Sequence, residues 1–596
     1  MSNPFSVKTP ETLSPKDIAD LFIDVFSDFP RIQASEHTFI HGPRGTGKSM
    51  MLRYLEPQVQ LAAHKVERAN ELSHYAIHMP VKSSYYNLSE LERLQGAPYW
   101  LLAEHFLISN AILHILKSLE KLVGLQSIET ECIKAFTKNV YSLADDTGCS
   151  LNQLEEYSTI SDLCNIFDAE RRAAKSYLAK LAFTQELIPY SDALFSYEDV
   201  FLPLVKLVKG LSVTPSGPLF LMLDDADNLP VRMQKIINGW VSYRSTNTVC
   251  LKISTQQRYK TWRTTQDILI ESSHDFSEVD ISSVYTSKNT SHYYDRVEQV
   301  VKRRLEIYNI KSSPSDFFPN SQDQELAIEA VKQKIKNDWD TGVKRVSSRK
   351  SDDITRYAVS EYMKSLGCTK KTNRYSYSGF KSMVNISSGM IRFFLEPAAR
   401  MFSEMTATNS SKNLTHIPFD VQDDVLYKWS EEFVLEEFER LKNDEATIKN
   451  DANHSTYMNN KVQGLKSLIN GLGELFQAKL VSDDSERRLI SFMVTNSPND
   501  NVQEILDLGV EWGYFHRKTI ARKEGLGRNT LYSLNRRLAP FFKLDPSGYA
   551  AHISITPEDL ELAIYDHRAF VRNRLAKVVT RKKSSTSNTQ QTSFDL

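Results

Sequence analysis

The segment at residues 41–52, HGPRGTGKSMML, constrains the fold more than any other part of the chain. It places three glycines and a lysine–serine pair between two apolar stretches. Residues Gly42-Pro43-Arg44-Gly45-Thr46-Gly47-Lys48-Ser49 match the pattern G-x-x-x-x-G-K-[ST]. Glycines allow such a loop to curl, so that successive backbone N–H groups point at phosphate oxygens. The pattern therefore predicts a phosphate-binding loop.

The residues on both sides of this loop support the same prediction. HTFIH (37–41) is typical of a short strand, and the stretch from Lys48 to about Leu55 is typical of a buried helix. The helix would add its positive N-terminal end to the loop. Lys48 would then contact the β and γ phosphates, and the Ser49 hydroxyl would be a ligand of Mg²⁺. We expect ATP and Mg²⁺ as the ligands, with a chance glycine-rich turn as the alternative.

A second segment, PLFLMLDDADNLP (218–230), supplies candidate carboxylates. The unbroken apolar run from Leu219 to Leu223 is typical of a parallel strand that is buried on both faces. It ends in Asp224 and Asp225, at the strand end where ligands bind in open α/β sheets. We expect Asp224 to hold Mg²⁺ through water and Asp225 to orient or deprotonate the attacking water, where many ATPases have a glutamate. The alternative is a strand followed by an aspartate-rich turn.

Further strands complete the predicted sheet. TVCLKIST (248–255) ends in polar residues, and Thr255 at its tip is positioned to reach the γ phosphate or the water, unless it is a simple strand end. FSEVDIS (276–282) and YAIHMPVKSSYYN (75–87) predict two more strands. About five strands with helical connections indicate a three-layer α/β domain.

These motifs, together with SSGMIR (387–392), resemble the AAA+ ATPases of the ORC/Cdc6 group in their bacterial form, which are related to the STAND-type ATPases. The resemblance implies a helical lid with a motif like G-G-N-P-R, whose arginine contacts the γ phosphate. Gly389 and Arg392 match that motif, whereas its asparagine and proline are absent. The resemblance also implies an arginine finger before the last core strand. Arg258 and Arg263 lie in that interval, but neither is in a diagnostic motif.

The remaining pattern divides the chain into several parts. We predict an ATPase core over 1–285, a lid over 286–410, a helical connector over 411–485, a winged helix over 486–565 and a basic, disordered tail over 566–596. Within the core, segment 97–200 has helical apolar spacing and predicts an inserted helical subdomain. This insertion either binds a partner or buttresses the core, and buttressing is the default.

The predicted winged helix resembles the domain that ORC/Cdc6-type proteins carry in this place. We expect a strand near 487–496, a helix over 499–513 and a helix-turn-helix whose recognition helix is Asn529–Leu538. A hairpin would follow in FFKLDPSGYAAHISI, turning at Asp545-Pro546-Ser547-Gly548. The residues expected to contact double-stranded DNA are Arg517, Lys518, Arg522, Lys523, Arg528, Asn529, Arg536 and Arg537. The alternative is a protein-contact module with a solvated basic face.

Composition limits these hypotheses. The chain has 596 residues and a net charge of −1, so a nucleic-acid surface must be local. Its five cysteines form no CxxC pair, which favours a reducing cytoplasm over disulfides or zinc. The N-terminus lacks a secretory signal pattern. WLLAEHFLISNAILHIL is interrupted by polar residues, which favours a buried helix over a membrane span.

Two functional hypotheses remain from the sequence. The first is an ATP-dependent DNA-binding switch in which the lid controls how the winged helix is presented. The second is a STAND-like regulatory or defence NTPase that senses a partner through the insertion, self-associates and acts through a separate effector protein.

Overall fold

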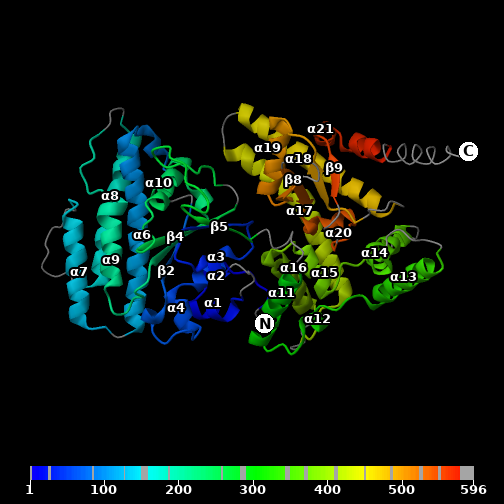
Figure 1. Cartoon of the computed structure of the whole chain (residues 1–596), viewed down its shortest axis with the longest axis horizontal. Coiled ribbons are helices and arrows are strands. Elements are labelled where there is room, and N and C mark those ends of the chain that lie inside the picture. Colours follow the sequence, from blue (N-terminus) through cyan, green and yellow to red (C-terminus); the bar gives the residue numbers. More distant parts are fainter. Residues whose placement is uncertain are drawn as a thin grey trace, which may run out of the picture. The chain divides into compact units, whose positions relative to one another are not determined.

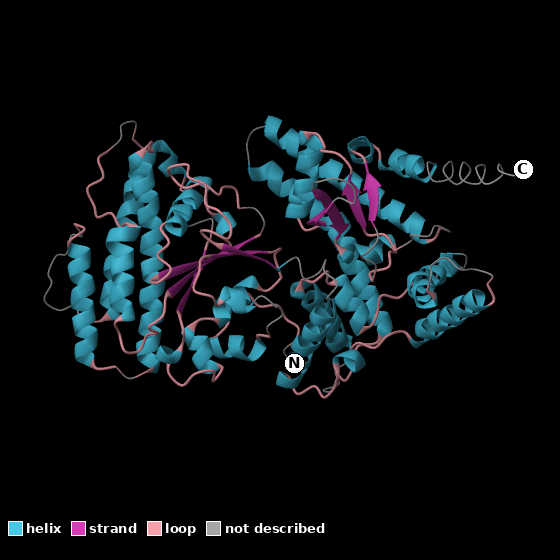
Figure 2. Cartoon of the chain, in the orientation of Figure 1, coloured by secondary structure: helices cyan, strands magenta, loops and turns pink. Residues whose placement is uncertain are grey.

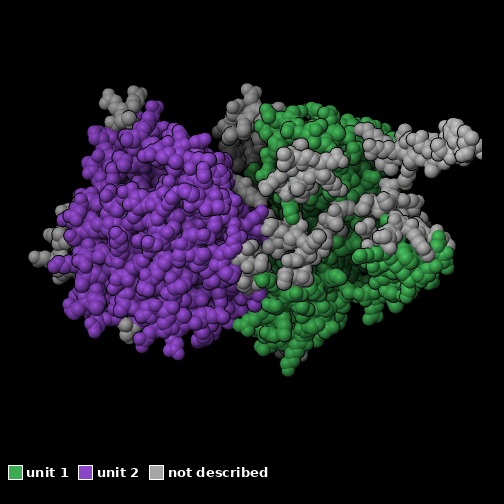
Figure 3. Space-filling model, viewed as in Figure 1, with its two compact units in different colours: residues 1–7, 283–596 green, residues 8–282 purple. Residues whose placement is uncertain are grey.

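The chain folds into two compact units in a computed structural model. One unit comprises Lys8–Ser282, and the other comprises Met1–Val7 together with Ser283–Leu596 (Figure 3). The structure describes residues 3–576 except 24–28, 83–85, 87, 127, 149–158, 185–187, 257–258, 282–289, 343–348, 368–373, 409–413, 449–451, 483–487, 522–527 and 548–551. We call the two units the P-loop unit (8–282) and the C-terminal unit (1–7 and 283–596).

A five-stranded parallel sheet forms the centre of the P-loop unit. Its strands are β1 (Thr38–His41), β2 (Tyr75–Pro80), β3 (Leu219–Asp224), β4 (Val249–Thr255) and β5 (Ser277–Asp280), in the order β2-β3-β4-β1-β5. Every pairing is parallel, and all residues of β3 and β4 are buried. This burial explains the unbroken apolar run before Asp224. All five predicted strands are confirmed, and their carboxyl ends lie along one edge.

Helices cover this sheet, as the three-layer prediction requires (Figures 1 and 2). Outside the insertion they are α1 (Pro15–Leu21), α2 (Phe29–Ile32), α3 (Lys48–Tyr54), α4 (Pro57–Ala62), α9 (Leu202–Lys209) and α10 (Val231–Ser242). Helix α3 begins directly after the glycine-rich loop, and Met51 and Leu52 bury it against the unit. The strand–loop–helix order of the sequence is therefore confirmed.

The predicted insertion contains the helices α6 (Ala97–Leu125), α7 (Thr130–Asp145) and α8 (Ile160–Ala182). They do not form a separate core. Leu107 and Leu116 of α6 belong to the same apolar cluster as Ile77 of β2 and Leu221 of β3. Among the described residues, α6 alone is long and apolar enough to cross a membrane, but 72% of its apolar window is buried inside the unit. The insertion thus packs as part of the P-loop unit, which is the buttressing arrangement.

The C-terminal unit begins with the predicted lid and connector. Its helices there are α11 (Thr290–Ile307), α12 (Pro314–Phe317), α13 (Gln322–Asp340), α14 (Lys350–Gly367), α15 (Phe380–Ile386), α16 (Ile391–Thr408), α17 (Phe419–Ile448) and α18 (Ala452–Leu480). One apolar cluster runs from Val297 of α11 through Trp429 of α17 to Phe492 and Phe570. Phe5 joins it, fully buried against Phe317. Lid, connector and C-terminal sheet therefore share a single core.

A four-stranded sheet follows the connector, and here the winged-helix prediction differs from the structure. The elements are β6 (Ser491–Val494), α19 (Asp500–Glu511), β7 (Phe515–Ala521), β8 (Arg528–Leu534), a 3₁₀ turn (Arg536–Leu538), α20 (Ala539–Phe542), β9 (His552–Ile555) and α21 (Pro557–Tyr565). The strand order is β7-β8-β6-β9. The predicted strand near 487–496 and the predicted helix over 499–513 are confirmed.

The predicted recognition helix, Asn529–Leu538, is wrong, because most of it is strand β8. Its residues alternate along the strand, with Tyr532 and Leu534 buried and Leu531 and Ser533 half-buried. This period of two is that of a strand packed on one face. The strand pairs antiparallel with β7 along its whole length, from Phe515↔Leu534 to Ala521↔Arg528. There is accordingly no helix-turn-helix in residues 514–542 outside the undescribed 522–527.

The predicted hairpin FFKLDPSGYAAHISI is also wrong. Phe541 and Phe542 lie in or beside α20, and β9 pairs in parallel with β6 instead of turning back on the preceding residues. Phe542 is buried, and its ring packs closely against Gly473 of α18. A Cβ atom at Gly473 would lie only 2.4 Å from the Phe542 ring. Packing against the connector helix α18, and not the turn-forming residues alone, therefore determines the conformation of this segment. Gly548 of the predicted turn lies outside the described residues.

Candidate nucleotide-binding site

The glycine-rich loop is closed by its own backbone and by Lys48. Gly42 N–H donates to Thr255 O at 3.1 Å, which ties the loop to the end of β4. Gly45 and Gly47 have φ values of +85° and +98°, which side chains with a Cβ rarely adopt. Lys48 Nζ donates to Gly42 O at 2.7 Å and to Pro43 O at 3.1 Å. The loop has the curled form that presents backbone N–H groups to an anion.

The Lys48 side chain, which ends in an ammonium group, is buried. Its side chain is 5% exposed, and burial lowers its pKa, whereas the carboxylates of Asp225, Asp224 and Asp227 act in the opposite direction. Thr46 Oγ1 donates to Pro43 O at 3.0 Å, and Arg44 is exposed at the loop tip. A buried ammonium beside three carboxylates is suited to bind a phosphate and a metal ion together.

Asp224 lies at the end of β3 and is 3% exposed. Its Oδ2 accepts a hydrogen bond from His78 Nε2 of β2 at 3.0 Å, and its Oδ1 accepts one from Ser254 Oγ of β4. Burial acts to raise the pKa of Asp224, but the hydrogen bonds from His78, Ser254 and Ser49 and the charge of His78 outweigh it and bring the pKa to about 2. The carboxylate is therefore ionised at neutral pH and is oriented by side chains of β2, β4 and α3.

Asp225 follows in a left-handed conformation, with φ +58°. Its N–H donates to Ser254 Oγ at 2.9 Å, and its Oδ1 accepts from Gln256 Nε2 at 3.1 Å. Gln256 N–H donates to Asp227 Oδ2 at 2.6 Å. Asp225 is thus a non-glycine residue held in a left-handed conformation, a kind of backbone strain that is often found at functional sites.

Thr255, which the sequence predicted to reach the γ phosphate or the water from the strand tip, contacts His41. It is fully buried, and its Oγ1 shares a hydrogen bond with His41 Nδ1 at 2.6 Å. Gln256 is the residue of this strand end that contacts Asp225. The sequence placed Ser254 and Gln256 among the polar residues at this strand end but gave the role to Thr255, and it gave no role to His78. The alternation of β4 was the available signal, because Ser254 and Gln256 fall on the same face of the extended chain.

The residues fit a magnesium ion. Ser49 bonds to Asp224, so the hydroxyl and the carboxylate lie within reach of one small cation. Mg²⁺ typically takes one or two protein oxygens and completes its shell with water and phosphate. The described residues contain no group of three or more His, Cys, Asp or Glu side chains that would hold a metal by themselves. The site accordingly suits a cation brought with a nucleotide.

The structure describes two of the three arginines that were predicted for the lid and the finger. Arg392 is exposed at the second position of α16 in the C-terminal unit, after Ser388 and Gly389, both of which have positive φ. Arg263 is exposed, and its Nη1 donates to Asp267 O at 2.7 Å. Arg258 lies outside the described residues. The roles of these arginines remain predictions.

The predicted DNA-contacting residues divide into three groups. Arg537 is 3% exposed, and its guanidinium lies 4.1 Å from the Trp429 ring centroid and 3.0 Å from Glu437 Oε1, so its assignment to DNA is wrong. Arg517, Lys518, Arg528 and Asn529 lie on the β7–β8 hairpin, and Arg536 lies in the 3₁₀ turn that follows it. Arg522 and Lys523 are outside the described residues.

The hairpin residues differ in their surroundings. Arg517 is exposed and pairs with Asp507 at 2.6 Å, whereas Asn529 Nδ2 contacts Met493 Sδ at 3.1 Å. Arg536 N–H donates to Ser388 Oγ at 2.7 Å, which joins this turn to the Ser388–Gly389 turn of the lid. Exposed ion pairs such as Arg517–Asp507 stabilise by only about 0–1 kcal/mol. The Arg517–Asp507 pair therefore contributes little to the stability of the hairpin.

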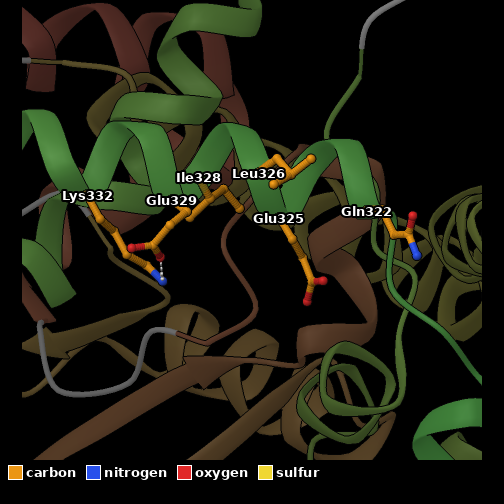
Figure 4. A pocket seen from close by; sticks show the side chains of 6 residues that line it. All are labelled: Gln322, Glu325, Leu326, Ile328, Glu329 and Lys332. Carbon is orange, nitrogen blue, oxygen red and sulfur yellow. Dashed lines mark hydrogen bonds and ion pairs between the residues drawn. The ribbon is translucent and has the colours of Figure 1, made fainter.

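A shallow pocket also lies along α13, far in sequence from the loop. It is lined by Gln322, Glu325, Leu326, Ile328, Glu329 and Lys332, and the Glu329–Lys332 pair spans part of it (Figure 4). All of these side chains come from one helix, and Leu326 is 71% exposed. Such a lining encloses little of a ligand, and we assign the pocket no role.

A parallel sheet of this order, with the glycine-rich loop after β1, the acidic residues at the end of β3 and polar residues at the end of β4, defines a P-loop ATPase of the AAA+ class. A comparison with protein families agrees, since the ORC-CDC6-like family matches residues 3–555. The chain belongs to the ORC-CDC6-like family, whose members are AAA+ ATPases. A search of curated proteins found no match.

Proposed function

We propose that this chain binds and hydrolyses ATP with Mg²⁺ and uses the nucleotide state to gate binding to double-stranded DNA. The observation that supports it most directly is the arrangement of Lys48, Ser49, Asp224 and Asp225 around one loop at the carboxyl edge of the sheet. Backbone N–H groups and Lys48 would hold the phosphates, and Ser49 and Asp224 would hold the cation. The bound cation would neutralise charge that develops on the phosphates.

Hydrolysis in this proposal depends on Asp225. An aspartate is one methylene shorter than the glutamate common at this position, so it reaches less far towards an attacking water. Its left-handed backbone and the hydrogen bond from Gln256 orient the carboxylate in one direction. Gln256, which can both donate and accept, would help to orient the same water. We therefore expect slow turnover, which suits a switch.

DNA contact is proposed for the β7–β8 hairpin instead of a recognition helix. Two-stranded ribbons fit the major groove as helices do. Arg517 and Lys518 of β7 would contact phosphates, with Arg528 at the start of β8. The lid and this hairpin belong to one unit with one core, and Arg536 N–H bonds Ser388. A nucleotide contact made by Arg392 would then act on the hairpin's unit as a whole.

Duplex binding by fluorescence anisotropy tests this function. It would be measured in apo, ADP and non-hydrolysable ATP states at two salt concentrations, with Lys48→Ala as the control. We expect salt-sensitive binding that changes with nucleotide in the wild-type protein and does not change in Lys48→Ala. No binding in any state would overturn the DNA proposal and leave the ATPase proposal standing.

A second candidate is the STAND-like NTPase that self-associates and acts through a separate effector protein. The observation that favours it is the internal use of predicted DNA residues, above all Arg537 in the core of the C-terminal unit. The basic surface is therefore smaller than the sequence predicted, and a smaller basic surface is consistent with contact with a protein. This candidate predicts little DNA affinity and a nucleotide-dependent increase in mass, which light scattering would measure.

A further inference from the structure

His78 contacts the carboxylate that the proposed site assigns to the metal ion. Its Nε2 lies 3.0 Å from Asp224 Oδ2, and the two side chains are 5% and 3% exposed. The strand register explains the contact. His78 of β2 is paired with Met222 of β3, and Asp224 lies two residues beyond Met222 on the same face of the sheet. His78 is therefore the diagonal neighbour of Asp224, at hydrogen-bonding distance.

The contact fixes one of two carboxylate oxygens. Ser254 donates to Oδ1 and His78 donates to Oδ2, so rotation of the carboxylate about its Cβ–Cγ bond would break both hydrogen bonds. Outer partners of this kind orient the groups that bind a metal ion or its water. A histidine that merely filled the core would not need a carboxylate acceptor at the metal end of the sheet.

The backbone of His78 is itself held by the insertion. His114 of α6 makes a hydrogen bond to the backbone of His78. Helix α6 also packs against β2 in the shared apolar core. The insertion thus braces the strand at the residue that contacts Asp224, far in sequence from both the loop and the acidic strand.

We propose that His78 is a positioning residue that holds the Asp224 carboxylate in the orientation needed to bind Mg²⁺ through water, and that α6 braces it there. This inference rests on the proposed nucleotide function. The role assigned to His78 is to act through Asp224, which its Nε2 contacts. Its loss should weaken metal binding and leave metal-free nucleotide binding unchanged.

The experiment uses the full-length chain and two separate equilibrium measurements. Binding of a fluorescent ADP analogue in EDTA reports the loop alone. Titration of Mn²⁺ into the protein–ADP complex, followed by electron paramagnetic resonance, reports the metal. We expect His78→Ala to weaken Mn²⁺ binding about tenfold, in line with the loss of an outer partner, and to change analogue affinity in EDTA less than twofold.

Two conservative variants separate positioning from packing. His78→Gln places an amide nitrogen near the position of Nε2 and should recover most of the Mn²⁺ affinity. His78→Asn is too short to reach Asp224 and should resemble His78→Ala, which keeps the test decisive if the alanine variant does not fold. His74→Gln is the matched control, because His74 lies four residues earlier in the chain, is buried, and stacks on Phe220 away from Asp224.

The outcomes are distinct. Weak Mn²⁺ binding in His78→Asn with recovery in His78→Gln and no change in His74→Gln supports the proposal. Wild-type Mn²⁺ affinity in His78→Asn overturns it, as does an equal loss in the glutamine and asparagine variants. If the wild-type protein binds the ADP analogue but no variant alters Mn²⁺ affinity, the positioning role alone fails. If the wild-type protein binds no nucleotide, the proposed function fails, and this inference fails with it.

Discussion

The two sheets of this protein were predictable from the sequence to very different degrees. In the P-loop unit every strand is parallel and β3 and β4 are fully buried, so β3 appears as a continuous apolar run that ends in Asp224, and β4 as an apolar run interrupted only by Lys252 before its polar end. In the C-terminal unit the sheet is mixed, β7 carries the adjacent basic residues Arg517 and Lys518, and buried and half-buried residues alternate along Leu531–Leu534 of β8. The sequence predicted a recognition helix over Asn529–Leu538, most of which is strand β8. Double-sided burial gives a clearer sequence signal than a half-exposed strand.

The largest expected difference between the two units is in how much folding stability each loses at acidic pH. His37, His74, His105 and His114 of the P-loop unit each have a pKa lowered to about 4, first of all by burial, whereas His516 alone of the described C-terminal residues has such a value. His37 Nδ1 and His105 Nδ1 accept backbone N–H groups, so their neutral forms are required. Protonation must therefore accompany unfolding.

The sign follows from these pKa values. An unfolded histidine titrates near 6.5, so between pH 6.5 and 4 the unfolded chain binds more protons, and stability falls as pH decreases. At pH 5.5 each histidine costs about 1.4 kcal/mol, or about 6 kcal/mol for the four together as an upper figure. The raised pKa values of Glu104 and Glu170, caused mainly by burial, oppose this loss. Hydrogen exchange at pH 7.5 and 5.5 should show the P-loop unit losing protection first; earlier loss in the C-terminal unit would contradict this.

The second largest effect concerns Arg537, which the sequence predicted on a DNA-binding surface and which the structure places in a core. Its guanidinium lies over Trp429 and Phe433, and Nη2 donates to Trp429 O at 3.1 Å. Arg537→Ala should reduce the free energy of unfolding of the C-terminal unit by about 3 kcal/mol. Urea denaturation measures this, with the exposed Arg517→Ala as a control expected to change stability by less than about 1 kcal/mol. A stable Arg537→Ala protein with weakened DNA binding would restore the original assignment.

A third prediction tests the strand tips of the P-loop unit. Asp225→Asn should reduce ATP turnover about 100-fold, or about 2.7 kcal/mol, while ATP affinity changes little, because a general base or water-orienting group acts mainly in the transition state. Single-turnover hydrolysis and equilibrium binding measure the two quantities. Turnover that survives in Asp225→Asn would move the catalytic role to another residue.

The fourth prediction compares neighbours on β4. Gln256→Ala should reduce turnover about tenfold, or about 1.4 kcal/mol, because it releases the Asp225 carboxylate. Thr255→Val should have a smaller effect, since Thr255 Oγ1 faces His41. Steady-state turnover at saturating ATP is the measurement. The reverse order would return the strand-tip role to Thr255.

The smallest expected effect is on the proposed DNA hairpin. The double variant Arg517→Ala/Lys518→Ala should lower the slope of log affinity against log salt by about 1.8, because each lost phosphate contact contributes about 0.9. Anisotropy titrations at several salt concentrations measure the slope. An unchanged slope would remove β7 from the interface and favour the STAND-like candidate.

The candidate site was predictable where its chemistry is local in sequence. Lys48 and Ser49 follow the glycines directly, and Asp224 and Asp225 end an apolar run, so both were expected on one edge of the sheet. Thr255 was preferred to Gln256 at the same strand end, and His78 was missed, because the roles of Gln256 and His78 depend on contacts across strands. His78 reaches Asp224 only through the register of β2 against β3.

The sequence by itself determined the P-loop unit's order of elements, its parallel sheet and the loop's phosphate-binding form, because glycine freedom and double-sided burial act over a few neighbouring residues. Only the tertiary structure decided the form of the described residues in 514–521, 528–547 and 552–555 and the place of Arg537. There, short segments compatible with helix or strand were settled by packing against α17, α18 and β6, whose apolar surfaces come from distant parts of the chain. Burial of Arg537 against Trp429 is a property of that packed core, and no spacing of basic residues encodes it.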